Sequence, residues 1–89
     1  MKEIEVEIKN VAGLHARPSA LLVQLASRFE AEITLISSGE EVNGKSIMGL
    51  MLLAAEKGRK ITLKADGEDE EEALNALKKL IEVDKFNEE

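Results

Sequence analysis

The segment from Val11 to Leu22 contains the only histidine of the chain, His15, and its only proline, Pro18. Proline has a fixed φ and no N–H to donate, so it fits the first turn of a helix and few deeper positions. An apolar helical run follows Pro18 directly, which predicts that a helix starts within a residue or two of His15. Free backbone N–H groups and the helix dipole at such a start favour an anion such as a phosphoryl group.

His15 is the candidate nucleophile at this helix start. The positive end of the helix dipole disfavours an imidazolium, so we expect the ring to be neutral and nucleophilic near pH 7. Arg17 can offer phosphate oxygens a planar fork of donors. A cation at this end of a helix is unfavourable by roughly 0.3–1 kcal/mol, which a visiting anion would offset. We expect Pro18 to hold the geometry of both residues. The alternative for His15 is an ordinary exposed loop residue.

Composition argues against several other kinds of site. With one histidine and no cysteine, ligands for a metal would have to be carboxylates gathered from distant positions, so we expect no metal and no cofactor. A net charge of −6 argues against direct nucleic-acid binding. No apolar run approaches the ~20 residues that span a bilayer, and the alternating charged N-terminus does not resemble a signal peptide. We therefore expect a cytoplasmic protein with no membrane partner, which binds other proteins.

Four segments alternate between apolar and polar residues, as strands with one buried face do. The polar residues Ser37-Ser38-Gly39 between the second and third segments predict the turn of a hairpin. The four predicted strands are Met1 to Lys9, Glu32 to Ser37, Glu40 to Asn43 and Arg59 to Ala65, with Ile4, Val6, Ile8, Ile33, Leu35, Ile61, Leu63 and Ala65 pointing inward.

Three segments have helical periodicity instead. The first helix begins at Ala16 and should end before Glu32. Ser46 is placed to cap a short second helix from Ile47 to about Leu53. Its residues are apolar nearly all round, so we expect one face in the core and the other exposed to partner proteins.

The third helix should begin at a capping box formed by Asp69 and Glu72. Beyond it, the polar tail from Asp84 to Glu89 is expected to fray. The predicted order is β-α-β-β-α-β-α in one domain, residues 1–89, and strands with one apolar face indicate an antiparallel sheet covered by helices on one side. The apolar stripe of the third helix is Ala73, Leu74, Leu77, Leu80 and Ile81.

Two segments resemble the signatures of one family. Gly13-Leu14-His15-Ala16-Arg17-Pro18 resembles the active-site signature of HPr, the histidine-containing phosphocarrier of the bacterial sugar phosphotransferase system. The segment Gly44 to Met51, GKSIMGLM, is similar to the regulatory serine segment of that family. The resemblance covers essentially the whole chain. It implies an α+β fold, a two-layer open-faced β-sandwich in which three helices cover one face of a four-stranded antiparallel sheet with strand order 1-4-2-3.

The resemblance also implies a function. An HPr protein accepts a phosphoryl group on Nδ1 of its histidine, here His15, from phospho-enzyme I and passes it to a sugar-specific enzyme IIA. The phosphoryl group originates from phosphoenolpyruvate, and the protein is a stoichiometric carrier, not an enzyme. We expect Arg17 and the backbone N–H groups of Ala16 and Arg17 to stabilise the charge of the transferring group.

A second role implied by the resemblance is regulatory phosphorylation at Ser46. It would involve a kinase/phosphorylase and a sugar-responsive transcription factor, with the protein acting as a corepressor in carbon catabolite repression. A phosphoserine at a helix N-terminus suits the dipole and changes the surface more than the fold. We expect a monomer. The docking surface implied by the family is Ala16, Arg17, Ala20, Gln24 and Ser27 on the first helix with Ile47, Met48 and Met51 on the second.

Other interpretations remain open. Relatives with regulation as their sole role lack the histidine, so His15 argues against regulation alone. The carrier could serve the nitrogen-related branch of the phosphotransferase system, although Ser46-Ile47-Met48-Gly49 resembles the carbohydrate branch more. A small α/β module that binds some other protein is a further alternative. Ala12 and Ala20 stand where many relatives carry a hydroxyl or amide side chain, which affects hydrogen bonding around the loop and partner preference.

Overall fold

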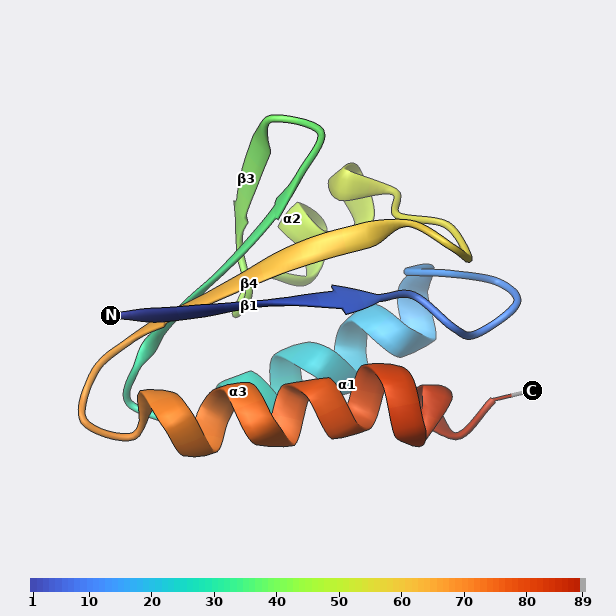
Figure 1. Ribbon diagram of the computed structural model, residues 1–89. Coiled ribbons are helices and arrows are strands. Elements are labelled where there is room, and N and C mark those ends of the chain that lie inside the picture. Colours follow the sequence, from blue (N-terminus) through green and yellow to red (C-terminus); the bar gives the residue numbers. More distant parts are fainter. Residues whose placement is uncertain (89) are drawn as a thin grey trace.

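Four strands and three helices follow one another in the predicted order (Figure 1). The computed structural model describes residues 1–88, and Glu89, the last residue of the predicted tail, lies outside them. Helix α3 continues through one π-helical turn, Lys79–Val83, and a single 3₁₀ turn, Lys85–Asn87. The elements are β1 (Lys2–Glu7), α1 (Ala16–Ala26), β2 (Glu32–Ser37), β3 (Glu40–Asn43), α2 (Ile47–Leu53), β4 (Lys60–Asp66) and α3 (Glu70–Lys78).

The strands form one antiparallel sheet in the order β1-β4-β2-β3. The central strand β4 pairs with β1 and β2, so that Leu63 lies opposite Ile4 on one side and Leu35 on the other. Side chains alternate along each strand, so this register puts the apolar residues of the three strands on one face of the sheet. The strand order implied by the family resemblance is confirmed.

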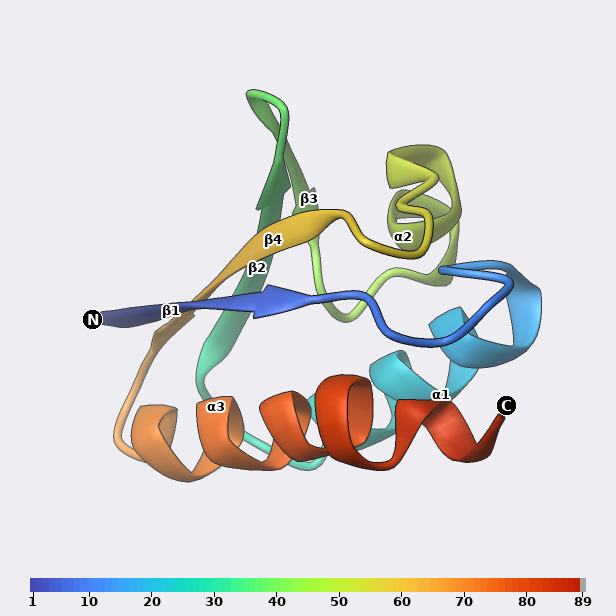
Figure 2. The same cartoon turned by 45° about the vertical axis from the view of Figure 1, so that its right-hand side comes forward.

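One face of the sheet carries the core. Helices α1 and α3 lie side by side across this face in both views (Figures 1 and 2), and α2 packs against α1 and β3. The inward residues predicted for the strands are buried, except Ile4, which is partly buried at the sheet edge. The whole predicted stripe of α3 is buried as well. Outward positions such as Lys60 and Glu5 are exposed, which leaves the other face to water.

The loop between β1 and α1 depends on a glycine. Gly13 has φ +71°, a left-handed conformation that residues with a Cβ seldom adopt. A Cβ at this position would also collide with the backbone of Ala55, and the N–H of the next residue, Leu14, donates to the Ala55 carbonyl at 2.8 Å. This close approach presses the loop onto the segment that follows α2. It thereby brings His15 next to α2.

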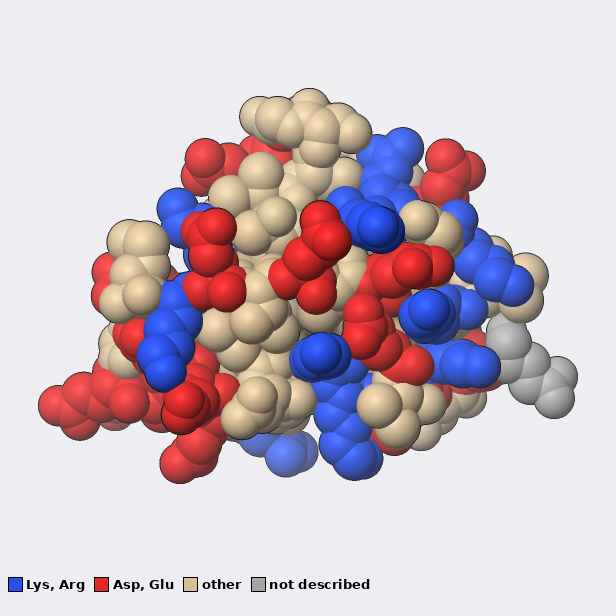
Figure 3. Space-filling model, in the orientation of Figure 1, with Lys and Arg blue, Asp and Glu red and all other residues tan. Residues whose placement is uncertain are grey.

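The capping box predicted for α3 is wrong. Asp69 is the N-cap residue, but its side chain makes no capping hydrogen bond. Its two carboxylate oxygens instead accept from the N–H groups of Glu30 and Ala31, both at 2.9 Å, and these bonds, the one from Glu30 first, lower the pKa of Asp69. Asp69 therefore joins the turn before β2 to the start of α3. Acidic side chains still gather over this helix start (Figure 3), where they suit the dipole.

The prediction that the tail from Asp84 frays is also wrong for the described residues. Phe86 is fully buried in the core. Lys85, Phe86 and Asn87 have positive φ values of 49°, 56° and 59°, a conformation that costs an L-residue roughly 1–2 kcal/mol. Burying a phenylalanine side chain contributes about 1.5–3 kcal/mol, so Phe86 offsets part of this cost. The tail folds back because it carries one of the two aromatic residues of the chain.

Helix α2 ends at its C-cap residue, Ala54, and the left-handed backbone conformation of this residue gives a testable prediction. Ala54 has φ 51° and ψ 39°, which costs an alanine about 1–2 kcal/mol, whereas glycine gives up about 0.5–1 kcal/mol more backbone entropy on folding. We therefore expect Ala54→Gly to raise the free energy of unfolding by about 0.5–1 kcal/mol, measured by urea denaturation.

The matched control is Ala76→Gly in the interior of α3, where the backbone is helical. Glycine there should lower the free energy of unfolding by about 1 kcal/mol. If both variants were destabilised alike, the left-handed conformation of Ala54 would be contradicted.

Candidate functional site

His15 is the N-cap residue of α1. Its carbonyl accepts the first helical hydrogen bond, from the Ser19 N–H at 3.0 Å, and its own N–H donates to the Gly13 carbonyl at 3.0 Å. The N–H groups of Ala16 and Arg17 come before Ser19 in the first turn and have no acceptor within the helix. Pro18 is buried in this turn. The predicted helix start is therefore confirmed, with two amides beside the histidine that have no acceptor within the helix.

The ring of His15 faces a carboxylate. Its side chain is 44% exposed, and Nε2 lies 3.3 Å from Oε2 and 3.4 Å from Oε1 of Glu88. Arg17 Nη1 donates to the same Oε2 at 3.2 Å and to the carbonyl of Phe86 at 3.0 Å. Instead of the visiting anion expected at this cation, the structure places an acidic side chain from the far end of the chain there. Figures 1 and 2 show the C-terminal turn beside the start of α1.

Asn10 completes this group of polar side chains. It is fully buried, and its Nδ2 donates to the Gly13 carbonyl at 2.9 Å and to Glu88 Oε1 at 3.0 Å. The hydrogen bond from Asn10 contributes most to lowering the pKa of the Glu88 carboxyl, and His15 and Arg17 lower it further. The carboxylate form of Glu88 is therefore favoured. The loop before α1 and the C-terminal segment, which are far apart in the sequence, are in contact here.

Sequence reasoning missed both Asn10 and Glu88. Glu88 lies in a polar tail with no periodicity, and Asn10 is a polar residue at the start of the loop that follows the first alternating segment, so neither was distinguishable from a solvated residue. The available signal was Phe86, an aromatic residue two positions before Glu88 in an otherwise polar tail. An aromatic side chain there indicates that the tail packs against the domain.

Helix α2 presents an apolar surface beside His15. Met51 and His15 line the same shallow hollow of about 280 Å³. Met48 and Leu52 are each 74% exposed, whereas Leu50 and Leu53 are buried. The expected division of this helix into a core face and an exposed face is confirmed. Exposed residues on α2 are Ile47, Met48, Met51 and Leu52.

The other predicted docking residues lie on α1. Ala16, Gln24 and Ser27 are exposed and Ala20 is half-buried. Since α1 packs against α2, the two helices can present one continuous surface with His15 between them. The docking role of these residues remains a prediction.

Ser46 caps α2 as predicted. Its Oγ accepts from the N–H of Gly49 at 3.0 Å, and its carbonyl accepts from the N–H of Leu50 at 3.1 Å. The side chain is partly exposed. The residue that follows, Ile47, belongs to the exposed apolar surface. A modification of the hydroxyl would thus remove a cap and add a group beside that surface.

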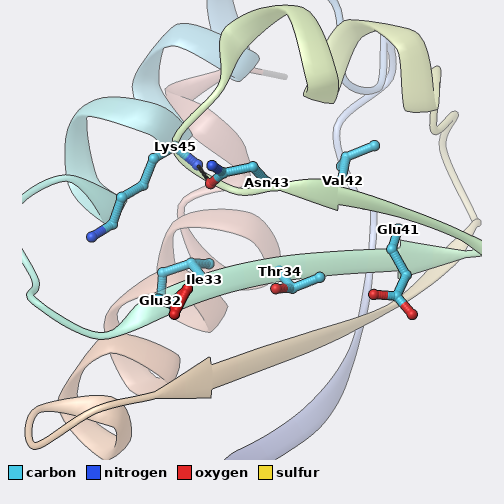
Figure 4. A pocket seen from close by; sticks show the side chains of 7 residues that line it. All are labelled: Glu32, Ile33, Thr34, Glu41, Val42, Asn43 and Lys45. Carbon is cyan, nitrogen blue, oxygen red and sulfur yellow. Dashed lines mark hydrogen bonds between the residues drawn. The ribbon is translucent and has the colours of Figure 1, made fainter.

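A larger hollow lies away from this chemistry. It measures about 360 Å³ and is lined by residues of β2, β3 and the turn that follows (Figure 4). In it the Lys45 N–H donates to Asn43 Oδ1 at 2.8 Å, a local turn contact. It has no nucleophile comparable to His15. The lining residues are Glu32, Ile33, Thr34, Glu41, Val42, Asn43 and Lys45.

Two further observations apply to residues 1–88. They contain no group of three or more histidine, aspartate or glutamate side chains placed to share a metal ion. Within the same part of the chain, no helix combines the length and the apolar character that a membrane crossing requires.

The chain is an open-faced β-sandwich with a histidine at a helix start, and proteins of one known family share its sequence and its fold. The family model described as "PTS HPr component phosphorylation site" matches residues 2–83. The phosphocarrier protein HPr of Xylella fastidiosa (strain Temecula1) is 52% identical over 89 residues, which span 100% of this chain and 99% of that protein. The chain therefore belongs to the HPr family.

Solved structures of similar proteins agree. HPr-C-His from Thermoanaerobacter tengcongensis superimposes with a TM-score of 0.95 at 54% identity, covering 100% of this chain and 99% of the other. Crh of Bacillus subtilis, described as a catabolite repression protein and as a swapped dimer, has a TM-score of 0.76 at 48% identity and covers 93% of each chain. The family thus contains proteins named as phosphocarriers and a protein named for catabolite repression.

The capping bond of Ser46 gives a prediction. Ser46→Ala removes the acceptor of the Gly49 N–H and should lower the free energy of unfolding by about 1 kcal/mol, in the range of roughly 0.5–2. Ser46→Asn keeps a side-chain acceptor and should stay within a few tenths of a kcal/mol of the parent. Thermal denaturation of the three proteins checks this. Equal losses in both variants would show that the cap contributes nothing.

Proposed function

We propose that this protein is a phosphoryl carrier of the phosphoenolpyruvate-dependent sugar phosphotransferase system, with His15 as the acceptor. The observation that carries the proposal is that His15 and Arg17 hold one anionic group between them, the Glu88 carboxylate, at a helix start. The carboxylate contacts Nε2 of His15 and not Nδ1, and a guanidinium that binds a carboxylate can also bind phosphoryl oxygens. Membership of the HPr family supports the same function.

The transfer exchanges one P–N bond for another. The lone pair of His15 Nδ1 forms a bond to phosphorus while the P–N bond of the donor phosphohistidine breaks, and its electron pair returns to the donor ring. Arg17 and the free N–H groups of Ala16 and Arg17 stabilise the charge on the three oxygens of the transferring group. Pro18 fixes the helix start that aligns them. Because the new bond is as labile as the old one, the protein is a carrier and not an enzyme.

The partners of this transfer are enzyme I as donor and enzyme IIA domains as acceptors, in the cytoplasm. A partner histidine must reach His15, so its protein has to cover the surface around it. The exposed apolar residues of α2 suit this contact, because flexible methionines adapt to more than one partner. We propose a monomer that docks through Ala16, Arg17, Ala20, Gln24 and Ser27 of α1 and Ile47, Met48 and Met51 of α2.

The test is phosphoryl labelling. With enzyme I and phosphoenolpyruvate that carries an isotopic phosphoryl label, the parent protein should take up one acid-labile label per chain. His15→Ala should take up none, because it lacks the ring nitrogen. Arg17→Ala should accept the label roughly 100–1,000-fold more slowly, since a charge-stabilising donor is lost. Label retained in His15→Ala would contradict the proposal.

We propose a second, regulatory function in which Ser46 is phosphorylated by a kinase/phosphorylase and the product acts as a corepressor with a sugar-responsive transcription factor. Ser46 lies directly before the exposed apolar residues of α2. A phosphate there would place about −1.5 to −2 charges beside the docking surface. The similarity to the Crh proteins of Bacillus subtilis and Halalkalibacterium halodurans supports this role.

Ser46→Asn separates modification from capping. Incubation with an HPr kinase and ATP should give the parent protein one acid-stable phosphoserine, whereas Ser46→Asn should remain unmodified although its helix is still capped. Phosphorylation of the parent at Ser46 should also slow its labelling by phospho-enzyme I, because both use the same surface. Acid-stable label in Ser46→Asn, or an unchanged labelling rate of the phosphoserine form, would refute the regulatory proposal.

A further inference from the structure

Asn10 is a buried polar side chain to which phosphoryl transfer assigns no role. It is fully inaccessible to solvent, and its amide group makes two hydrogen bonds. One is local, to the Gly13 carbonyl in the loop before α1. The other crosses 78 positions of sequence to Glu88 Oε1. Its Nδ2 thus connects the loop before His15 to the C-terminal segment, while its Oδ1 is buried without a hydrogen-bond partner among the described residues.

The contact leaves Glu88 in a defined position. Its side chain is only 19% exposed, although it is the second residue from the end of the chain. Asn10 Nδ2 holds one carboxylate oxygen at 3.0 Å and Arg17 Nη1 holds the other at 3.2 Å. The preceding turn is itself held, because Phe86 is buried and its carbonyl accepts from Arg17 at 3.0 Å. Glu88 is therefore part of a constructed site.

The ring of His15 meets this carboxylate with Nε2 only. The distances are 3.3 Å to Oε2 and 3.4 Å to Oε1. An ionised carboxylate can only accept a hydrogen bond, so the contact favours the form of the neutral ring that carries its proton on Nε2. In that form Nδ1 has a free lone pair.

We propose that Glu88, held in place by Asn10, is a positioning residue that keeps the proton of His15 on Nε2 and so makes Nδ1 the nucleophilic nitrogen. This inference rests on the proposed function of His15 as phosphoryl acceptor. It adds two residues to the reaction that do not touch the phosphoryl group. Both act through the orientation and the protonation of the ring.

The same contact also stabilises the charge that the ring of His15 acquires during the transfer. When Nδ1 forms its bond to phosphorus, the donor P–N bond breaks and its electron pair remains with the donor ring. The proton stays on Nε2, so the imidazole of His15 becomes positively charged. The carboxylate of Glu88 faces that proton and stabilises the charge, as a carboxylate does for a protonated histidine in other catalytic groups. When the phosphoryl group leaves, the ring returns to the neutral form with the same proton in place.

The experiment measures the ring directly. Nitrogen-15 NMR of His15, at a pH where the ring is uncharged, reports which nitrogen carries the proton. The parent protein should have it on Nε2. In Glu88→Gln the population protonated on Nδ1 should rise several-fold, and acceptance of the phosphoryl group from phospho-enzyme I should slow by about tenfold. Glu5→Gln, which removes an exposed charge on β1, is the matched control and should change neither quantity.

Asn10→Ala provides a second variant. It leaves the carboxylate of Glu88 in the chain but removes its anchor, so the proton should move in the same direction. The NMR signal is read on the folded protein, which separates this effect from any loss of stability caused by emptying a buried site. An unchanged proton position in both variants would overturn the inference.

A slower Glu88→Gln with an unmoved proton would overturn the inference as well, because Glu88 would then act through something other than the ring. Failure of the proposed function gives a different result. In that case the parent protein takes no label on His15, while the NMR measurement still shows whether Glu88 controls the ring.

Discussion

The candidate site depends on one carboxylate that two of its side chains share. Glu88 lies against His15 and Arg17, and it is kept there by the buried amide of Asn10. A guanidinium at the positive end of a helix is unfavourable on its own, and so is a carboxylate packed into a largely buried position. Together they satisfy each other. Together with the burial of Phe86, this interaction holds the polar tail in place and gives the exposed side chains of His15 and Arg17 defined positions.

The sheet order makes this meeting possible. Since β1 and β4 are neighbours and α1 and α3 lie side by side on the same face, the end of β1, the start of α1 and the end of α3 arrive at one end of the molecule. Gly13 lets the loop approach Ala55, which adds the segment after α2 to the same end. The result is a site without a deep cavity. Such a site suits the proposed transfer, in which His15 has to meet a histidine of a partner protein.

Helix α2 is a short element with one face in the core and the other exposed beside His15. Leu50 and Leu53 supply its contacts with the core, and Met48 and Leu52 remain exposed. The helix is only seven residues long, and helices of this length are marginal in isolation. Its cap by Ser46 and its packing therefore both contribute to holding it in place. A change at Ser46 affects the fold and the surface at the same point.

Several features could be predicted from the sequence because they are local. The alternation in Glu32 to Ser37 and the capping position of Ser46 depend on neighbours within a few residues, and both predictions are confirmed. Pro18 likewise located the start of α1, and with it His15. The strand order came from resemblance to a family, since several orders satisfy the same alternation. The site roles of His15 and Arg17 remain predictions that their geometry supports.

What only the tertiary structure decided involves partners far apart in the chain. The carboxylate of Asp69 matches a capping box by spacing, yet it binds the N–H groups of Glu30 and Ala31, which no local rule brings near. The tail around Phe86 looked polar, yet the burial of one aromatic ring draws it onto the domain. Hydrogen bonds between distant segments depend on which surfaces the core brings together. Local spacing carries no information on that choice, so the contact between Asn10 and Glu88 could be recognised only in the tertiary structure.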